Sequence, residues 1–160
     1  MLPEEVTKSI GKAGDVIILE VEKGAIRRYA DAVDDQNPLY WDEEYARNSG
    51  YDSILAPPGF WGWPTKWARG SAFPVFSEAM VELIVALTRA GYNQTIDGGI
   101  EYEFFSPVRA GDTLSALSVI KDITEREDRV GKVVFVIAET AYTNQNGDLV
   151  AKVRHIFVNR

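Results

Sequence analysis

Hydrophobic and polar positions change their period several times along the chain, and each period predicts one kind of element. Residues 15–21 are rich in β-branched side chains and predict a strand. Residues 23–33 then predict a helix with one apolar face, because apolar side chains recur at helical spacing at Ile26, Tyr29, Ala30 and Val33. This helix is expected to end in a turn before Pro38, since Asn37 precedes a proline and avoids helical geometry.

Two further helices are indicated by residues that cap helix ends. Asp42 starts a short helical segment with acids in its first turn, and Gly50 closes it. Ser77 starts a longer helix over 78–90, which Gly91 ends. The 78–90 segment is apolar nearly all round, so we expect another surface to bury it.

The rest of the chain predicts strands over about 100–105, 113–126, 130–143 and 149–158. Residues 128–131 and the Asn146-Gly147 pair supply the reversals between the last three. A strand and helices followed by a run of antiparallel strands is an α+β order. A chain of 160 residues fits one ordinary domain, and no linker or internal repeat divides residues 1–160.

Composition narrows the classes of function. The chain holds no cysteine and one histidine, His155, which excludes disulfides, thiolate chemistry and multi-histidine metal sites. A net charge of −7 without a Lys/Arg cluster argues against a nucleic-acid or anionic-membrane surface. No apolar run approaches the roughly 20 residues of a membrane-spanning helix. Because the first residues also lack a secretory signal pattern, we expect a cytoplasmic protein.

Three motifs resemble those of the MaoC-like hydratases and dehydratases. Residues 29–46 (YADAVDDQNPLYWDEEYA) resemble the hydratase motif, in which an aromatic residue precedes Gly-Asp-x-Asn-Pro-Leu/Ile-His. Residues 54–60 (ILAPPGF) resemble the start of the central-helix region in the FAS1-like, amino-terminal type of MaoC dehydratase domain. Residues 107–114 (PVRAGDTL) resemble the strand entry Pro-x-x-x-Gly-Asp-Thr-Leu of that family. The motifs occur in order and together span most of the chain.

This resemblance implies a hot-dog fold, in which an antiparallel sheet wraps around a central helix, and a dimer that binds a thioester between its subunits. It implies a hydro-lyase reaction, the reversible addition of water to a trans-2-enoyl thioester that gives a 3R-hydroxyacyl product. In the family, the motif Asp and His activate the water, and a backbone N–H at the start of the central helix polarises the thioester carbonyl. No cofactor or metal is implied, because CoA or an acyl carrier protein is the handle of the substrate.

Carried onto this sequence, the motif places Asp35 at the acid of the family with Asn37 beside it, but Tyr40 occupies the histidine position. A phenol with an ordinary pKa of about 10 is a poor base at neutral pH, and loss of a general base costs about 10²–10⁴ in rate. The glycine whose N–H polarises the carbonyl falls at Pro58, which has no N–H, unless Gly59 supplies the donor. The catalytic site is therefore expected to be incomplete.

These departures indicate the acyl-thioester-binding subunit of a MaoC-like (R)-specific enoyl-CoA hydratase or 3-hydroxyacyl dehydratase. Such a chain resembles the non-catalytic, substrate-holding subunits of heterodimeric hydroxyacyl dehydratases of the mycobacterial type. Alone it would be weak or inactive, and a partner chain with an intact Asp and His would perform the chemistry. Two alternatives remain open: a self-sufficient homodimeric hydratase that uses Asp35, and a non-enzymatic acyl-CoA-binding module.

The predicted site residues also have purely structural interpretations. Asp35 and Asn37 favour turns before proline, Tyr40 can be a packed aromatic residue, and His155 is expected to pack in the sheet or face a partner. The predicted acyl pocket, lined or covered also by the 78–90 helix, consists of Pro58, Gly59, Phe60, Trp61, Trp63 and Trp67. These aromatic residues could instead form core or interface. Lys66, Arg69 and Arg109 are candidates for CoA phosphates, although scattered basic side chains are usually just solvated.

Overall fold

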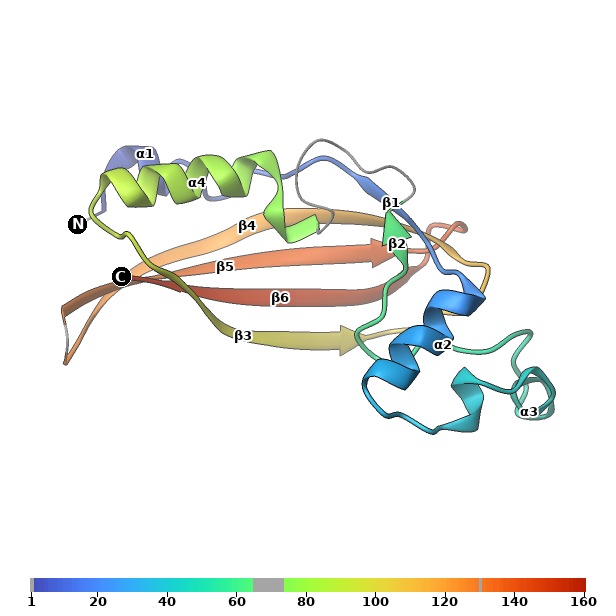
Figure 1. Cartoon of the computed structure of the whole chain (residues 1–160). Helices are drawn as coiled ribbons and strands as arrows, with labels where there is room; N and C mark the ends of the chain where they lie inside the picture. Colours follow the sequence, from blue (N-terminus) through green and yellow to red (C-terminus); the bar gives the residue numbers. More distant parts are fainter. Residues whose placement is uncertain (1, 65–73, 130) are drawn as a thin grey trace.

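Six strands form one antiparallel sheet in the computed structural model, which describes residues 2–64, 74–129 and 131–160. The strands are β1 (Ile17–Glu20), β2 (Trp63–Pro64), β3 (Thr95–Phe104), β4 (Thr113–Asp128), β5 (Gly131–Thr143) and β6 (Leu149–Asn159). Their order across the sheet is β2-β1-β4-β5-β6-β3. Figure 1 shows β4, β5 and β6 side by side as the long centre of the sheet, with β3 along one border.

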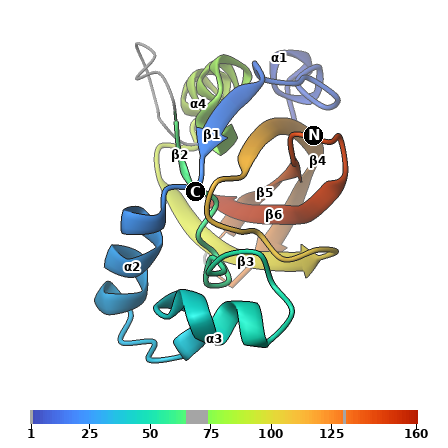
Figure 2. The ribbon, with the colours of Figure 1, turned by 90° about the vertical axis from the view of Figure 1, so that its right-hand side faces the viewer.

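Helices cover the two ends of this sheet with different segments of the chain. They are α1 (Glu4–Thr7), α2 (Lys23–Ala32), α3 (Glu43–Asn48) and α4 (Glu78–Arg89), with 3₁₀ turns η1 (Pro38–Tyr40) and η2 (Pro74–Phe76). α4 lies over one end with α1 beside it, whereas α2 and α3 lie together at the other end (Figure 1, Figure 2). The predicted α+β class is confirmed. Among the described residues, no helix is long and apolar enough to cross a membrane.

Helix α4 begins where the sequence predicts, because the Ser77 side chain accepts a hydrogen bond from the Met80 N–H (3.4 Å). Its inner face buries Met80, Leu83 and Leu87 among side chains of β4, β5 and β6, including Ile120, Val136 and Phe157. On its outer face, Val81 and Val85 are 53% and 45% exposed in the single chain.

A second core cluster lies at the other end of the sheet, beneath α2. Ile26 of α2 and Ile54 of the loop after α3 are fully buried there against Leu114 of β4 and Val153 of β6. The predicted helix and the short helix capped by Asp42 are both present, and Asp42 Oδ1 accepts from the Glu44 and Tyr45 N–H groups. This cluster holds the 34–42 turn region against the sheet.

Strand β3 differs most from its prediction. It begins at Thr95 rather than near residue 100, because Gly98-Gly99 forms a bulge inside the strand instead of a boundary before it. Gly98 lies so close to β6 that an added Cβ atom would be 3.0 Å from the Ile156 carbonyl oxygen. Two glycines therefore mark a close backbone contact here, which a strand in isolation does not reveal.

Candidate functional site

A cavity of about 340 Å³ lies at the end of the sheet that carries α2 and α3. Three segments form its wall: residues 39–40 of η1, the loop from Leu55 to Trp61, and the end of β3 with the residues that follow it. The lining residues are Leu39, Tyr40, Leu55, Ala56, Pro57, Pro58, Phe60, Trp61, Phe104, Phe105, Ser106, Pro107 and Val108. The wall is almost entirely apolar or aromatic, as expected of a site that takes an apolar ligand.

Trp61 is the centre of the aromatic side of this wall. Its ring stacks on Tyr142 of β5 with ring centres 4.9 Å apart, and on Phe104 of β3 at 5.8 Å. Tyr102 completes the group, 6.2 Å from Trp61 and 5.8 Å from Phe104. Burial raises the pKa of the Tyr142 phenol, with a smaller contribution from Tyr102. This phenol stays neutral, so the group presents an uncharged, rigid surface to the cavity.

The motif residues Asp35, Asn37 and Tyr40 lie together in one tight turn that leads into the cavity. Asp35 Oδ1 accepts a hydrogen bond from the Asn37 N–H, and Asn37 Oδ1 accepts one from the Leu39 N–H, each at 3.1 Å. The Trp41 indole N–H donates to the Asp35 carbonyl oxygen at 2.9 Å. Both acidic and amide side chains thus shape the turn, and of the three motif residues only Tyr40 is among those that line the cavity.

The chemistry available at Tyr40 is that of a neutral phenol. Burial raises its pKa, the charge of Asp35 raises it further, and a side-chain hydrogen bond with Asn37 opposes the shift. A raised pKa means that the phenolate form is even scarcer at neutral pH than for a free tyrosine. Tyr40 can donate a hydrogen bond to a ligand, but it cannot accept a proton from water as a histidine would.

The Pro58-Gly59 pair forms a β-turn and does not begin a helix. The Phe60 N–H donates to the Pro57 carbonyl oxygen (3.0 Å), and Gly59 adopts a φ of 91°. Proline at the second position and a residue with positive φ at the third are typical of a type II turn. The segment resembles the start of a central helix in sequence, yet α4 begins only at Glu78. A helix N-terminus is therefore not the source of a carbonyl-polarising N–H at Pro58 or Gly59.

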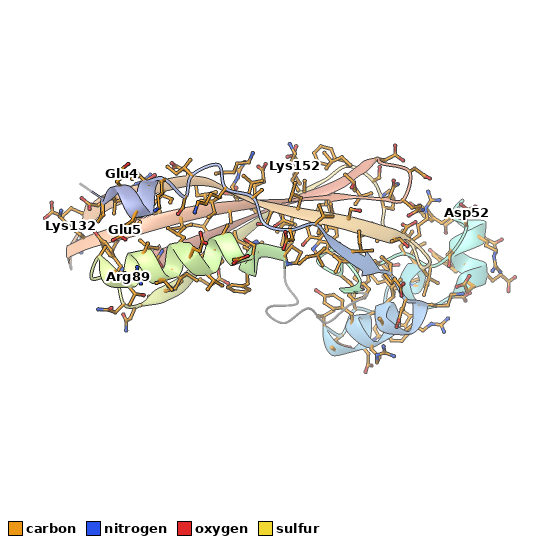
Figure 3. The ribbon with its side chains drawn as sticks, turned by 90° about the horizontal axis from the view of Figure 1, so that it is seen from above. Glu4, Glu5, Asp52, Arg89, Lys132 and Lys152 are labelled. Carbon is orange, nitrogen blue, oxygen red and sulfur yellow. The ribbon has the colours of Figure 1, made fainter. Side chains whose placement is uncertain are left out.

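The basic residues predicted to meet CoA phosphates are only partly placed. Arg109 forms an ion pair with Asp52, with Nη1 and Oδ2 2.9 Å apart, at the end of the molecule that carries α3 (Figure 3). Its guanidinium is thus already paired at the surface. Lys66, Arg69 and Trp67 lie outside the described residues, and only the backbone of Trp63 is described, in β2.

His155 lies in β6, opposite Ala138 of β5 and Ile100 of β3, and is not among the residues that line the cavity. Its ring stacks on Phe157 with ring centres 6.1 Å apart. Its Nδ1 atom is buried and has no hydrogen-bond partner within the described chain. Burial lowers its pKa, and the charge of Asp97 opposes that shift. The geometry is that of a packed imidazole in the sheet.

Sequence reasoning predicted four of the thirteen lining residues, namely Tyr40, Pro58, Phe60 and Trp61, and missed the other nine. Phe104 and Phe105 at the end of β3, and Leu39 beside Tyr40, were not predicted as site residues. A signal for Phe104 was present, because Tyr102 and Phe104 alternate on one strand face directly before the Pro107 motif. Nothing local indicates that this strand end meets the loop from Leu55 to Trp61.

The sequence matches a family model and is similar to known proteins. Residues 8–153 match the family model described as FAS1-like, dehydratase domain region. The chain is similar to a protein of Thermomonospora curvata named "Probable enoyl-CoA hydratase alpha subunit", with 32% identity over 135 residues. The match covers 81% of this chain but 41% of that relative, so the chain spans less than half of its length.

Two solved structures from Mycobacterium tuberculosis have a similar fold. The ChsH1-ChsH2 complex contains a chain with a TM-score of 0.78 and 19% identity, over 96% of this chain and 90% of that chain. The truncated HadBC (3R-hydroxyacyl-ACP dehydratase) complex contains one with a TM-score of 0.66 and 22% identity, over 96% and 98%. At identities this low, structural similarity establishes the fold alone. This similarity confirms the predicted hot-dog fold.

Proposed function

Because the chain belongs to the MaoC-like hydratase and dehydratase family, in its FAS1-like dehydratase region, we propose that it is an acyl-thioester-binding subunit that works with a catalytic partner chain. The reaction is hydration of a trans-2-enoyl thioester or the reverse dehydration. The observation that carries the proposal is the apolar cavity of about 340 Å³ beside a motif turn whose histidine position holds a protonated phenol. The cavity is large and apolar enough to hold an acyl chain, whereas Tyr40, at the histidine position, is a poor proton acceptor.

The division of labour follows from what each group can do. Trp61, Phe60 and Phe104 offer apolar surface to an acyl chain, and burial of that chain supplies binding energy in proportion to the apolar area removed from water. Water activation needs a base with a pKa near the working pH, and Tyr40 has a pKa above its already high ordinary value. In the proposed assignment, the base therefore comes from another chain. The names of the T. curvata relative, an alpha subunit, and of the two M. tuberculosis complexes support this assignment.

The first experiment measures loss of the conjugated thioester absorbance of a trans-2-enoyl-CoA. The purified chain is tested alone and mixed with a MaoC-like chain that carries the complete Asp and His motif. Turnover in the mixture that exceeds the sum of the two separate chains is expected. High turnover by the lone chain would contradict the proposal.

Asp35 variants distinguish the remaining alternatives. Asp35→Asn removes the carboxylate but keeps an oxygen that can accept the Asn37 N–H, so the turn is preserved. In the subunit assignment, Asp35→Asn changes turnover of the mixture by less than about threefold. In a self-sufficient homodimer, the same change would reduce turnover by about 10²–10⁴, the usual value of general acid–base catalysis.

A pure binding module has a separate signature. Such a protein would gain thermal stability from a saturated acyl-CoA yet give no turnover with any partner.

Tyr40→His, with Tyr40→Phe as its matched control, tests directly whether the missing histidine limits catalysis. Gain of turnover by the lone Tyr40→His chain, and none by Tyr40→Phe, would show that the missing base is the defect that separates this site from a catalytic one.

A further inference from the structure

Two buried polar atoms in the inner strands of the sheet have no hydrogen-bond partner in the part of the chain that the structure describes. They are the hydroxyl oxygen of Thr140 in β5 and Nδ1 of His155 in β6. Thr140 is fully buried. An unsatisfied buried polar group destabilises a fold, so its presence in a native protein calls for an explanation, such as a bound molecule that completes the hydrogen bond.

The two side chains are neighbours on the same face of the sheet. Thr140 pairs with Val153 across the strands, and Ala138 pairs with His155, so Thr140 and His155 are diagonal neighbours. Side chains that lie two residues apart on a strand, or opposite each other on paired strands, share one face. Diagonal neighbours lie about 7–8 Å apart, which leaves room for one atom to bond to both.

Apolar core lies on both sides of this Thr140–His155 pair. The core cluster beneath α2 includes Tyr142, two residues after Thr140, and the cluster beneath α4 includes Ala138, two residues before it. A valine at position 140 would have nearly the same shape as threonine and would leave no unsatisfied hydroxyl. Residues that reduce the stability of the free protein in this way are typical of binding sites.

A strip of partly exposed side chains on β3 leads from the cavity to this pair. Phe104 lines the cavity, and Tyr102 and Ile100 follow on the same strand face, with 52%, 44% and 40% exposed. Ile100 is the direct cross-strand partner of His155, and Figure 1 shows β3, β6 and β5 side by side. The four steps from Phe104 to Ile100, at about 3.3 Å each, place the pair about 13 Å along the sheet from the cavity wall. The far end of an acyl chain in the cavity can therefore reach it.

The chemistry of the pair suits an oxygen atom. Burial lowers the pKa of His155, so its imidazole is neutral at neutral pH, and Nδ1 of a neutral ring can either donate or accept a hydrogen bond. The Thr140 hydroxyl can do both. Both groups can donate to a ketone oxygen, or one can donate to a ligand hydroxyl while the other accepts from it. A hydrocarbon group can satisfy neither of them.

We propose that Thr140 and His155 form a polar subsite that binds an oxygen substituent, a ketone or a hydroxyl group, on the acyl group at a distance from the thioester. This deepens the proposed function, on which it rests for the binding of an acyl thioester. The chain then prefers an oxygenated acyl group to a plain hydrocarbon chain, although the cavity wall is mostly apolar. Discrimination is strong at such a pair, because a ligand without the oxygen leaves buried polar groups unpaired.

Binding of saturated acyl-CoAs, measured by isothermal titration calorimetry, tests the subsite without turnover. The probes are dodecanoyl-CoA and analogues with one ketone at the middle or near the end of the chain, since about ten carbon–carbon bonds of about 1.5 Å in a zigzag span 13 Å. The wild type is expected to bind one ketone analogue at least about fivefold more tightly than dodecanoyl-CoA. Thr140→Val should lose at least about threefold of this preference and still bind dodecanoyl-CoA, whereas Thr140→Ser, which keeps a hydroxyl, should retain it.

Two further variants separate the subsite from packing. His155→Phe keeps a flat ring that can stack on Phe157 but removes both ring nitrogens, and it should lose the preference as Thr140→Val does. The matched control is Thr143→Val in the same strand, where the hydroxyl already donates to the Ser115 carbonyl oxygen at 3.5 Å. It should keep the preference. Thr140→Val should not lower the melting temperature of the free protein, because the hydroxyl that it removes is unsatisfied.

The possible failures of the proposal are distinguishable. Equal or weaker binding of every ketone analogue by the wild type, together with binding of dodecanoyl-CoA, would overturn the subsite and leave the proposed function intact. No binding of any acyl-CoA would contradict the proposed function itself, and the subsite with it. A Thr140→Val chain that melts at a lower temperature without ligand and keeps the ketone preference would assign the two atoms to a structural water and overturn the subsite.

Discussion

The two ends of the sheet are covered in opposite ways. At one end, α4 buries Leu83 and Leu87 against β4, β5 and β6, and a cavity lined by Met80, Leu87 and Phe157 has a volume of about 10 Å³, no larger than one water molecule. At the other end, a turn and a proline-rich loop cover the same sheet and leave a cavity of about 340 Å³. The regular packing of α4 fills the space at the first end. At the second end, irregular backbone with large aromatic rings leaves room for a ligand.

This contrast predicts that one end of the sheet contributes to folding stability and the other to ligand binding. Residues under α4 are expected to contribute to folding stability alone, since close packing there leaves no access for a ligand. Residues around Trp61 are expected to contribute less to folding stability, because they pack less closely and leave an apolar surface accessible to a ligand. Matched substitutions at the two ends can therefore separate stability from binding.

The largest effect is expected from truncation under α4. Leu83→Ala removes a side chain that is 0% exposed and leaves a new cavity, so the free energy of unfolding should fall by about 2–5 kcal/mol. Leu39→Ala makes the same chemical change in the wall of the existing cavity and should cost about 1 kcal/mol. Urea denaturation of both variants measures the difference. Equal losses would mean that the two ends are packed alike.

An intermediate effect is expected from Trp61, on binding. Trp61→Leu removes the ring that stacks on Tyr142 and Phe104 and opens the wall of the cavity. The dissociation constant for a saturated acyl-CoA should rise at least about tenfold, equivalent to about 1.4 kcal/mol. Phe76→Leu is the matched control, because Phe76 contacts Phe157 at the α4 end and lies outside the cavity. Isothermal titration calorimetry tests both, and equal loss of affinity would place the binding site elsewhere.

What the sequence predicts well is local in origin. Ser77 and Asp42 accept hydrogen bonds from N–H groups two or three residues ahead, so the starts of α4 and α3 follow from a few neighbouring residues. The same holds for the turn from Asp35 to Tyr40, in which the Asp35 and Asn37 side chains each accept from an N–H two residues ahead. The family motifs also lie within such short stretches, which is why they indicate the hot-dog fold.

What the sequence does not predict depends on contacts between distant segments. Gly98-Gly99 marks a close contact with β6 instead of a strand boundary, and only the pairing of β3 with β6 shows this. Phe104 joins the cavity because β3 ends beside a loop more than 40 residues earlier in the chain. The tight packing of Phe104 against Trp61 is invisible in either segment alone.

The smallest effect concerns His155, which lies in the sheet next to Phe157 of the α4 end and tests how far the tight packing extends. Burial lowers its pKa in the folded state, so the unfolded chain takes up a proton more readily near its ordinary pKa of about 6.5. Its contribution to stability is therefore present in full above that ordinary pKa and is lost as the pH falls through the lower folded pKa. Asp97 raises the folded pKa and narrows this window.

The measurement is the melting temperature of the wild type and of His155→Gln between pH 7.5 and 5.5, a range above the titration of ordinary carboxylates. The wild type should lose more stability than His155→Gln on acidification, because glutamine keeps polarity at this position but does not titrate. A smaller slope in the variant would mean that the imidazole is held neutral by the packing around Phe157. Parallel slopes would mean that the ring gains solvent when protonated, and that tight packing ends at Phe157 rather than reaching the middle of the sheet.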